Sequence, residues 1–336
     1  MYTSEVLVAQ GGKYWGYGAG ETVTIEPPRG VDRLPDEWRI KLGEHQLDEP
    51  WMVELDDVDL CGQALVGIWR RDIVLDTAYF GRIDLWERNK PYWDWALEAM
   101  KIPPKKIELA TSFTGVWSDN YFHRVLDYLP RLKAIDEYKK QTGEEPTILL
   151  HRPLDYMVET LDQLGYKYEV VEGYHYRVNR LLVISNPRKE GLIYPWAIKY
   201  LQSKLGESVH APRKIYISRK NATKRRVLNE DDYIPGLLNK GYTIATPEKM
   251  GIKGQADYFR DAEMVIGPHG AGLANIAWSL NPKTIELVTP AYTNPCCWMV
   301  AACMGWDYGF VMADATGKED LIVDEYKLFR TMEMLS

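Results

Sequence analysis

The chain has 336 residues, of which 46% are hydrophobic and 26% are charged. Such a chain can bury the cores of two ordinary domains, which excludes a disordered protein. Its formal net charge of -7 at pH 7 argues against nucleic acid or an anionic membrane as a partner, because both attract basic surfaces. Any site for an anionic ligand must therefore be local.

The opening residues and the four cysteines set the expected compartment. The opening lacks the basic and apolar regions of a signal peptide, and no run of about 18 apolar residues occurs. We therefore expect a cytoplasmic protein without a transmembrane segment. Cys61, Cys296, Cys297 and Cys303 form no CxxC pair, and adjacent cysteines bridge each other only with strain. Reduced thiols and no metal site are expected.

The first 90 residues differ in pattern from the rest. Short β-like runs at residues 22–25 and 64–75, broken by glycine and proline clusters, predict a β-rich portion over residues 1–90. Beyond it, helical patterns alternate with short apolar runs, which predicts an α/β architecture. The strands predicted there are residues 147–150, 180–184, 214–218, 243–245, 264–267 and 284–288.

A proline-containing, charged segment at residues 186–195 predicts a domain boundary. We expect an N-terminal domain over residues 1–188, β-rich at first and α/β from residue 91. A C-terminal domain is expected over residues 189–316. The helical pattern of residues 317–336 predicts a final helix.

The segment SDNYFHRVLDYLPRL, residues 118–132, predicts a capped helix. His123 and Asp127 are four residues apart, so a helix places both on one face. Either side chain could act as a general base. The alternative is an exposed i,i+4 ion pair.

A basic loop, defined here as residues 219–226, follows the predicted strand at 214–218 and contains five cations in eight residues. The carboxyl ends of parallel strands are where open α/β sheets bind ligands, and arginine matches phosphate oxygens bidentately. Arg219, Arg225 and Arg226 are therefore candidate phosphate ligands. The alternative is a solvated loop that pairs with the acidic residues 230–232.

The predicted strand at 264–267 leads into HGAGLAN, residues 269–275, a turn of small residues. Such a turn lets backbone N–H groups approach an anion at the start of a helix. His269 could donate to a phosphate or a sugar hydroxyl, and Asn275 could orient the helix start. The alternative is a glycine turn whose histidine is satisfied by the backbone.

Glu286 lies inside the apolar strand predicted at 284–288. A buried carboxylate costs several kcal/mol unless it is paired or hydrogen-bonded, so a specific partner is expected. That partner is either a ribose or sugar hydroxyl of a ligand or an arginine of the basic loop.

These blocks, in this order over roughly residues 110–312, resemble glycosyltransferase family 61, the capsular-polysaccharide type. The resemblance implies a GT-B-like fold, with two Rossmann-like domains facing across a cleft. It also implies metal-independent, inverting transfer of a sugar to a glycan or polysaccharide hydroxyl. The substrate is expected to be a nucleotide-sugar donor, UDP-linked, and no cofactor is expected.

The resemblance also assigns roles by position. His123 and Asp127 match the catalytic H-x-x-x-D block, although Arg124 replaces the hydrophobic or aromatic residue expected after the histidine. The positions that match donor-binding residues are Arg219, Arg225, Arg226, Asn229, His269, Gly270, Ala271, Gly272, Asn275 and Glu286.

Other classes find less support in the sequence. HGAG resembles the oxyanion-hole turn of α/β-hydrolases, but the chain has no G-x-S-x-G nucleophile elbow. It also has no P-loop motif and no DxD triplet in a loop after a strand. The remaining alternative is a catalytically inactive nucleotide-sugar or glycan-binding protein of the same fold.

Overall fold

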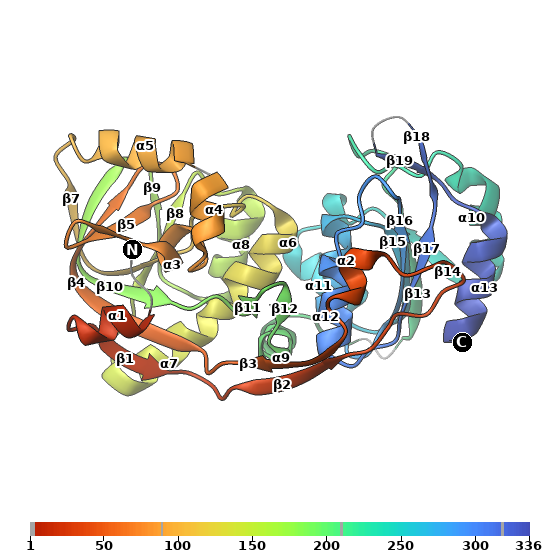
Figure 1. Cartoon of the computed structure of the whole chain (residues 1–336), viewed down its shortest axis with the longest axis horizontal. Coiled ribbons are helices and arrows are strands. Elements are labelled where there is room, and N and C mark those ends of the chain that lie inside the picture. The colour runs from red at the N-terminus through yellow and green to blue at the C-terminus, as the bar shows by residue number, and fades with distance from the viewer. Residues whose placement is uncertain (1–3, 89, 209–210, 317–318) are drawn as a thin grey trace. The chain divides into compact units, whose positions relative to one another are not determined.

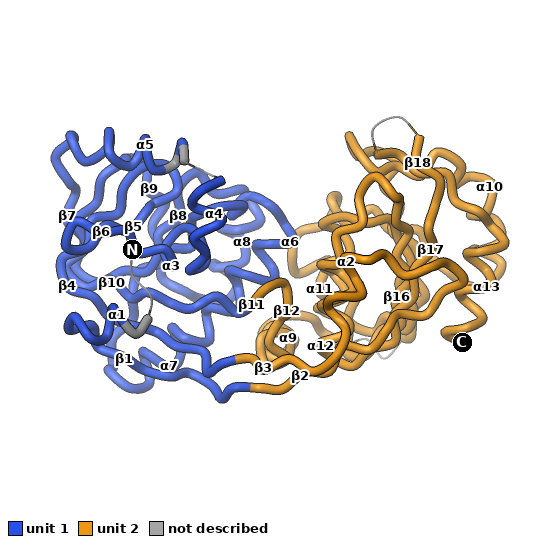
Figure 2. The backbone as a smooth tube through the Cα atoms, viewed as in Figure 1, with its two compact units in different colours: residues 1–20, 48–187 blue, residues 21–47, 188–336 orange. Residues whose placement is uncertain are grey.

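The structure is a computed structural model that describes residues 4–88, 90–208, 211–316 and 319–336. The chain divides into two compact units (Figure 2). Unit 1 contains residues 1–20 and 48–187, and unit 2 contains residues 21–47 and 188–336. The sequence placed all of residues 1–188 in one domain, so the assignment of residues 21–47 to unit 2 differs from that expectation.

Unit 1 is built on a mixed sheet in the order β6-β5-β4-β10-β7-β8-β9, with β1 beside β4 (Figure 1). The pairs among β1, β4, β5, β6 and β10 are antiparallel, whereas β10, β7, β8 and β9 run parallel. The strands are β1 (Lys13–Gly16), β4 (Trp51–Cys61), β5 (Val66–Trp69), β6 (Asp72–Val74), β7 (Lys105–Ser112), β8 (Thr147–His151), β9 (Tyr168–Val171) and β10 (His175–Ile184).

The core of unit 1 centres on β4 and β10. Both strands are mostly buried because they occupy the middle of the sheet, and their apolar residues form one cluster. The helical elements are α1 (Ser4–Ala9), α3 (Leu75–Ala78), α4 (Ile83–Arg88), α5 (Lys90–Ala99), α6 (Tyr121–His123), the π-helix η1 (Arg124–Tyr128), the 3-10 helix η2 (Leu129–Arg131), α7 (Leu132–Thr142) and α8 (Asp155–Leu164).

Unit 2 contains a parallel sheet in the order β14-β13-β15-β16-β17. Four of its strands lie within two residues of the predicted ones, and β17 was not predicted. The α/β class is therefore confirmed, with a purely parallel sheet in unit 2 and a mixed one in unit 1. The strands are β13 (Arg213–Ile217), β14 (Tyr242–Ala245), β15 (Ala262–Pro268), β16 (Lys283–Val288) and β17 (Tyr308–Met312).

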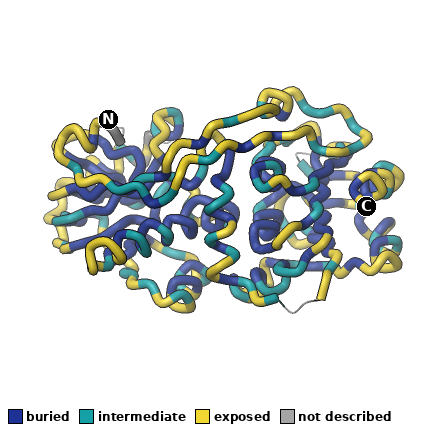
Figure 3. Tube along the Cα trace, turned by 90° about the horizontal axis from the view of Figure 1, so that it is seen from below, coloured by how far each residue is buried: buried dark blue, intermediate teal, exposed yellow. Residues whose placement is uncertain are grey.

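Helices cover both faces of the unit 2 sheet (Figure 1). On one face, α10 (Glu230–Asn239) and α13 (Glu325–Leu335) share a buried apolar cluster with alternate strand residues. The other face carries α9 (Pro195–Lys204), α11 (Ile252–Phe259), the 3-10 helix η4 (Ala271–Trp278) and α12 (Cys296–Cys303). The central strands of both sheets are mostly buried. Figure 3 shows buried stretches inside each unit and exposed stretches along its outer turns. Smaller elements are η3 (Pro247–Lys249), β11 (Arg188–Lys189), β12 (Leu192–Ile193), β18 (Asp314–Thr316) and β19 (Asp320–Ile322).

The packing of residues 21–47 explains why they belong to unit 2 and not to unit 1. Strands β2 (Glu21–Ile25) and β3 (Gly43–Leu47) pair antiparallel and flank the short helix α2 (Asp36–Arg39). Trp38 of α2 is fully buried, and its ring stacks on Trp298 with the centroids 5.1 Å apart. A large aromatic side chain buries more apolar area than any other kind, so Trp38 anchors the segment to unit 2.

The end of the chain is less helical than expected. Residues 317 and 318, at the predicted start of the last helix, lie outside the described residues. Strand β19 follows them, and α13 begins only at Glu325, where the Asp324 carboxylate accepts from the backbone N–H of Lys327. In the part of the chain that the structure describes, no helix has the length and apolar character needed to cross a membrane.

The packing of Trp38 predicts a large stability effect. Trp38→Ala should lower the free energy of unfolding of unit 2 by about 3–5 kcal/mol, because it removes a fully buried aromatic side chain. Ile40→Ala, two residues away and 76% exposed, should change it by no more than about 0.5 kcal/mol. Urea unfolding of the full chain measures both values. Equal effects of the two variants would contradict the assignment of residues 21–47 to unit 2.

Candidate active site

The strand order of unit 2 locates a ligand site. Strand β13 has β14 on one side and β15 on the other, so the direction of strand succession reverses between β13 and β15. In open parallel sheets, ligands bind outside the carboxyl ends of the strands at such a switch point. Arg219 follows β13 and His269 follows β15. The two predicted donor-binding loops therefore meet at one edge of the sheet.

Arg219 lies against the HGAG turn. A Cβ atom at Gly270 would collide with the Arg219 guanidinium, so the glycine permits this close approach. Arg219 Nη2 donates to the carbonyl oxygen of Lys224 at 3.0 Å, while its buried Nε has no hydrogen-bond partner among the described residues. Burial and the neighbouring Arg225 lower the pKa of Arg219. The negative charge of an anionic ligand would raise the pKa of Arg219 again and so offset both causes.

The two other arginines of the basic loop differ in their surroundings. The Arg225 guanidinium carbon lies 4.8 Å from the ring centroid of Tyr292, and its nearest carboxylate oxygen, from Glu319, is 3.6 Å away. Arg226 instead forms a fork with Asp320, at 2.5 and 3.1 Å. Arg225 is therefore brought to the same edge as His269, and Arg226 is committed to an ion pair within the unit.

A buried carboxylate holds His269. Glu286 is fully buried, and its Oε1 accepts from His269 Nδ1 at 2.5 Å, while its Oε2 accepts from the Tyr308 hydroxyl at 2.7 Å. The expected partner, a ligand hydroxyl or an arginine of the basic loop, was wrong. A histidine and a tyrosine within the unit satisfy the carboxylate. Burial alone would lower the pKa of His269, but the charge of Glu286 and the Cys296 thiol outweigh burial and raise it to about 10.

The turn after His269 is held from inside. Asn275 is fully buried, and its amide donates to Gln255 Oε1 at 2.9 Å and to the carbonyl oxygen of Gly272 at 3.0 Å. Asn275 therefore shapes the turn from inside the unit. Its role in donor binding stays a prediction. The helix predicted here is the 3-10 helix η4. Ala271 and Gly272 at its start are partly exposed.

Asn229 and Glu230 follow the basic loop and form hydrogen bonds with other parts of unit 2. Asn229 exchanges two hydrogen bonds of 2.9 Å with the backbone of Val323. Glu230 is buried and accepts from the Ser218 hydroxyl at 2.8 Å. The hydrogen bonds of the Asn229 side chain thus go to Val323 and not to His269. Of the ion pairs expected from the solvated-loop alternative, Lys220 pairs with Asp231 at 3.0 Å on the exposed side.

The loop after β16 contributes residues that sequence reasoning did not select. The Tyr292 ring centroid lies 5.0 Å from that of His269. Cys296 Sγ lies 4.0 Å from His269 Nε2 and 4.0 Å from Cys297 Sγ. The hydrogen bond from Cys297 lowers the pKa of Cys296 to about 5 despite burial, and His269 adds to the effect. Their position in the sequence could have identified them, because they follow a predicted strand whose carboxyl end lies at the same edge of the sheet.

The predicted pair in unit 1 forms across a π-helix. Asn120 caps α6 by accepting from the Phe122 N–H at 3.0 Å, and η1 follows directly. His123 Nδ1 lies 2.6 Å from Asp127 Oδ2. Asp127 is fully buried, whereas the His123 side chain is 18% exposed and stacks on Trp117. The alternative of an exposed ion pair was therefore wrong, and π-helical turns of this kind often mark functional sites.

Arg124, the departure from the family pattern, is a buried residue. Its guanidinium carbon lies 5.8 Å from the ring centroids of Phe113 and Tyr128, and Nη1 donates to the carbonyl oxygen of Phe113 at 3.1 Å. Within the described ranges, its Nε and Nη2 have no hydrogen-bond partner. Burial lowers the pKa of Arg124 to about 10. Arg124 thus stands among aromatic rings, at the position where the family pattern expects a hydrophobic or aromatic side chain.

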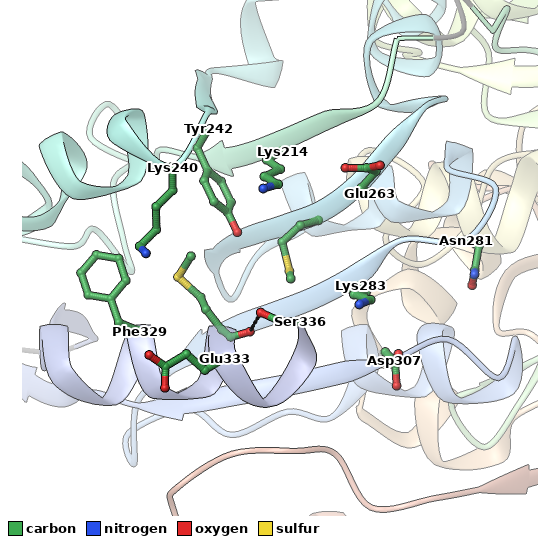
Figure 4. A pocket seen from close by; sticks show the side chains of 12 residues that line it. Lys214, Lys240, Tyr242, Glu263, Asn281, Lys283, Asp307, Phe329, Glu333 and Ser336 are labelled. Atoms are coloured by element: carbon green, nitrogen blue, oxygen red, sulfur yellow. Dashed lines mark hydrogen bonds between the residues drawn. The ribbon is translucent and has the colours of Figure 1, made fainter.

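A pocket of about 670 Å³ lies at the opposite edge of the unit 2 sheet (Figure 4). It is lined by residues at the amino-terminal ends of the strands and by the last turn of α13. Because ligands of open parallel sheets bind at the carboxyl ends, we do not place the donor there. The labelled lining residues are Lys214, Lys240, Tyr242, Glu263, Asn281, Lys283, Asp307, Phe329, Glu333 and Ser336.

Comparison with known families supports the resemblance found in the sequence. The family model described as Glycosyltransferase 61 matches residues 121–286, a span that runs from the start of α6 to Glu286. The chain belongs to glycosyltransferase family 61. Membership supports a glycosyltransferase activity that acts on a donor and an acceptor. No curated protein matches the chain.

The contrast between two arginines of this family 61 protein predicts effects of different size on ligand binding. Arg219→Ala should weaken UDP binding at least about tenfold, because a hydrogen bond from a charged group contributes roughly 1.5–3 kcal/mol. Arg226→Ala, which loses only its exposed pair with Asp320, should leave the affinity within about threefold. Calorimetric titration measures both. Unchanged affinity in Arg219→Ala, with normal thermal stability, would remove Arg219 from the site.

Proposed function

We propose that the protein transfers a sugar from a nucleotide-sugar donor, UDP-linked, to a hydroxyl of a glycan or polysaccharide, with inversion and without a metal ion. The observation that carries the proposal is the cationic cluster at the switch point of unit 2. Arg219, Arg225 and the protonated His269 gather there beside a turn of small residues. A diphosphate is the ligand that this combination of charge and N–H donors fits best.

The cluster would act on the leaving group. As the bond between the anomeric carbon and the diphosphate oxygen breaks, its electron pair passes to the diphosphate, which gains negative charge. Donors that are fixed before the reaction stabilise such charge without reorganisation. His269 is held by Glu286, and the Arg219 guanidinium lies against Gly270, so both cations are fixed by contacts within unit 2.

The His123–Asp127 pair would supply the base. Asp127 is fully buried, so it can orient His123 but cannot itself meet an acceptor. Because Nδ1 of His123 is bound to Asp127, Nε2 is the nitrogen that would take the proton of the acceptor hydroxyl as its oxygen attacks the anomeric carbon. The second function of Asp127 is to stabilise the imidazolium that forms, since it carries the opposite charge. The fold that we infer for this division of labour is GT-B-like, with the acceptor bound through unit 1 and the donor through unit 2.

Chelation tests the absence of a metal requirement. Transfer from a UDP-sugar panel to glycan acceptors should continue in EDTA, because arginines and backbone dipoles take the place of a divalent ion at the diphosphate. Product formation with and without EDTA is the measurement. Complete loss of activity that manganese or magnesium restores would sink metal independence. Donor binding with neither transfer nor donor hydrolysis across the panel would favour the inactive binding protein.

Replacing Asp127 tests the base. Asp127→Asn keeps the size but removes the carboxylate that orients His123, so turnover should fall by at least about two orders of magnitude. UDP affinity should stay within about threefold of the wild type, because the proposed donor site lies in unit 2. Steady-state kinetics and calorimetric titration give the two values.

A matched control separates catalysis from surface chemistry. Glu159→Gln alters an exposed i,i+4 pair with Gln163 in α8 of the same unit and should leave turnover unchanged. If Asp127→Asn also retains near wild-type turnover, the base lies elsewhere, and Asp119 and His151 are the next residues to test. If donor affinity collapses instead, the division of labour between the units is wrong.

A further inference from the structure

Three soft or borderline ligand groups converge beside the proposed donor site. Cys296 and Cys297 open helix α12, and His269 begins the turn after β15. One ligand atom from each lies within 4.8 Å of the other two. Cys297 and His269 are buried, at 1% and 5% exposure, whereas Cys296 is partly exposed. Cys296 is thus the member of the cluster that a metal ion from solvent can reach first.

We propose that His269, Cys296 and Cys297 form a binding site for one zinc ion. Sulfur ligands at about 2.3 Å and nitrogen ligands at about 2.0–2.1 Å from a tetrahedral zinc lie roughly 3.5–3.8 Å apart. Cys296 Sγ is 4.0 Å from both His269 Nε2 and Cys297 Sγ, and the third side of the triangle is at most 4.8 Å long. To close on the ion, the first two sides must shorten by a few tenths of an ångström and the third by up to about 1.3 Å. Three protein ligands leave the fourth position of the ion to water or to an oxygen of a bound ligand.

The surroundings of His269 match those of a metal ligand. Metal-binding histidines usually donate their second ring N–H to a carboxylate, which fixes the tautomer and the ring orientation. Here Nδ1 is bound to Glu286, so Nε2 is the nitrogen that points to the thiols. Glu286 is in turn held by the Tyr308 hydroxyl. This second layer of contacts exists in the chain before any metal arrives.

Charge and chemistry favour zinc over harder cations. Thiolate and imidazole ligands suit zinc, whereas magnesium and calcium prefer oxygen. Two thiolates balance the charge of a divalent ion, and the protons of the thiols and of His269 Nε2 leave as the metal binds. A disulfide between the two cysteines is the competing fate of the cluster. Their sulfurs lie 4.0 Å apart, against about 2.05 Å in a disulfide, and adjacent cysteines bridge only with strain.

Direct metal binding by the full, reduced chain tests the proposal. Zinc titration should show one tightly bound ion, and cobalt should give the intense charge-transfer absorption of thiolate coordination. Alkylation followed by peptide mass spectrometry should show zinc protecting the partly exposed Cys296, with the buried Cys303 serving as the internal reference. Absence of stoichiometric binding, or cobalt spectra without the thiolate band, would overturn the proposal in the wild-type protein itself.

Substitutions assign the ligands. Cys296→Ser and Cys297→Ser should each weaken zinc binding by more than about a hundredfold, because each removes a direct ligand. Glu286→Gln should cost only about 10–100-fold, as expected of a residue behind a ligand. Cys303→Ser, in the same helix, should leave the affinity unchanged. Circular dichroism and thermal melting confirm folding, and wild-type zinc affinity in a folded Cys296→Ser,Cys297→Ser double variant would refute the site.

One consequence rests on the proposed function. If His269 Nε2 serves the diphosphate, zinc takes that nitrogen, so zinc and UDP should weaken each other's binding by the same factor. Zinc would then inhibit transfer, and EDTA would leave it intact or raise it. Zinc binding that does not alter UDP affinity would keep the metal site and remove His269 from the donor site. Absence of zinc binding would overturn the metal site and leave the donor proposal standing.

Discussion

The arrangement of the unit 2 site depends on one buried carboxylate. Glu286 sits in the middle of an apolar strand with no exposure, a position that costs several kcal/mol unless both oxygens are satisfied. Tyr308 on the neighbouring strand satisfies one oxygen and His269 the other. The carboxylate thereby fixes the imidazole at the carboxyl edge of the sheet. Burial would lower the pKa of His269, but Glu286 and Cys296 raise it, which favours an additional positive charge at that edge.

The topology of unit 2 explains why the other cations gather at this imidazole. Parallel strands deliver every following loop to the same edge, and the reversal of strand order between β13 and β15 opens a space between two of those loops. Arg219 enters from one loop and can lie close against the other because Gly270 has no side chain. The third loop, after β16, adds Tyr292 beneath Arg225. The cluster thus follows from strand order and one glycine.

Much of this was predictable from the sequence, and the failures share a cause. Apolar runs bounded by turns predicted four of the five strands of the parallel sheet in unit 2 to within two residues, and i,i+4 spacing predicted the His123–Asp127 contact. The partner of Glu286, the burial of Asp127 and the attachment of residues 21–47 through Trp38 were missed. Each depends on contacts between residues far apart in the chain, which local pattern does not encode. The sequence identified Cys296 only as a reduced thiol, because two segments far apart in the chain bring it close to His269.

The two histidine–carboxylate pairs show how burial divides the chemistry within one chain. Both join Nδ1 to a fully buried carboxylate, at 2.5 Å for His269 and 2.6 Å for His123. His269 is itself buried, and with a pKa near 10 it stays cationic at neutral pH, which suits it to an anion and prevents it from accepting a proton. A general base must be unprotonated and must reach its substrate. His123 is the partly exposed member of the two, so in the proposed reaction the proton of the acceptor would pass to the pair in unit 1. Exposure thus separates two similar pairs, one suited to meeting an acceptor and the other to holding an anion.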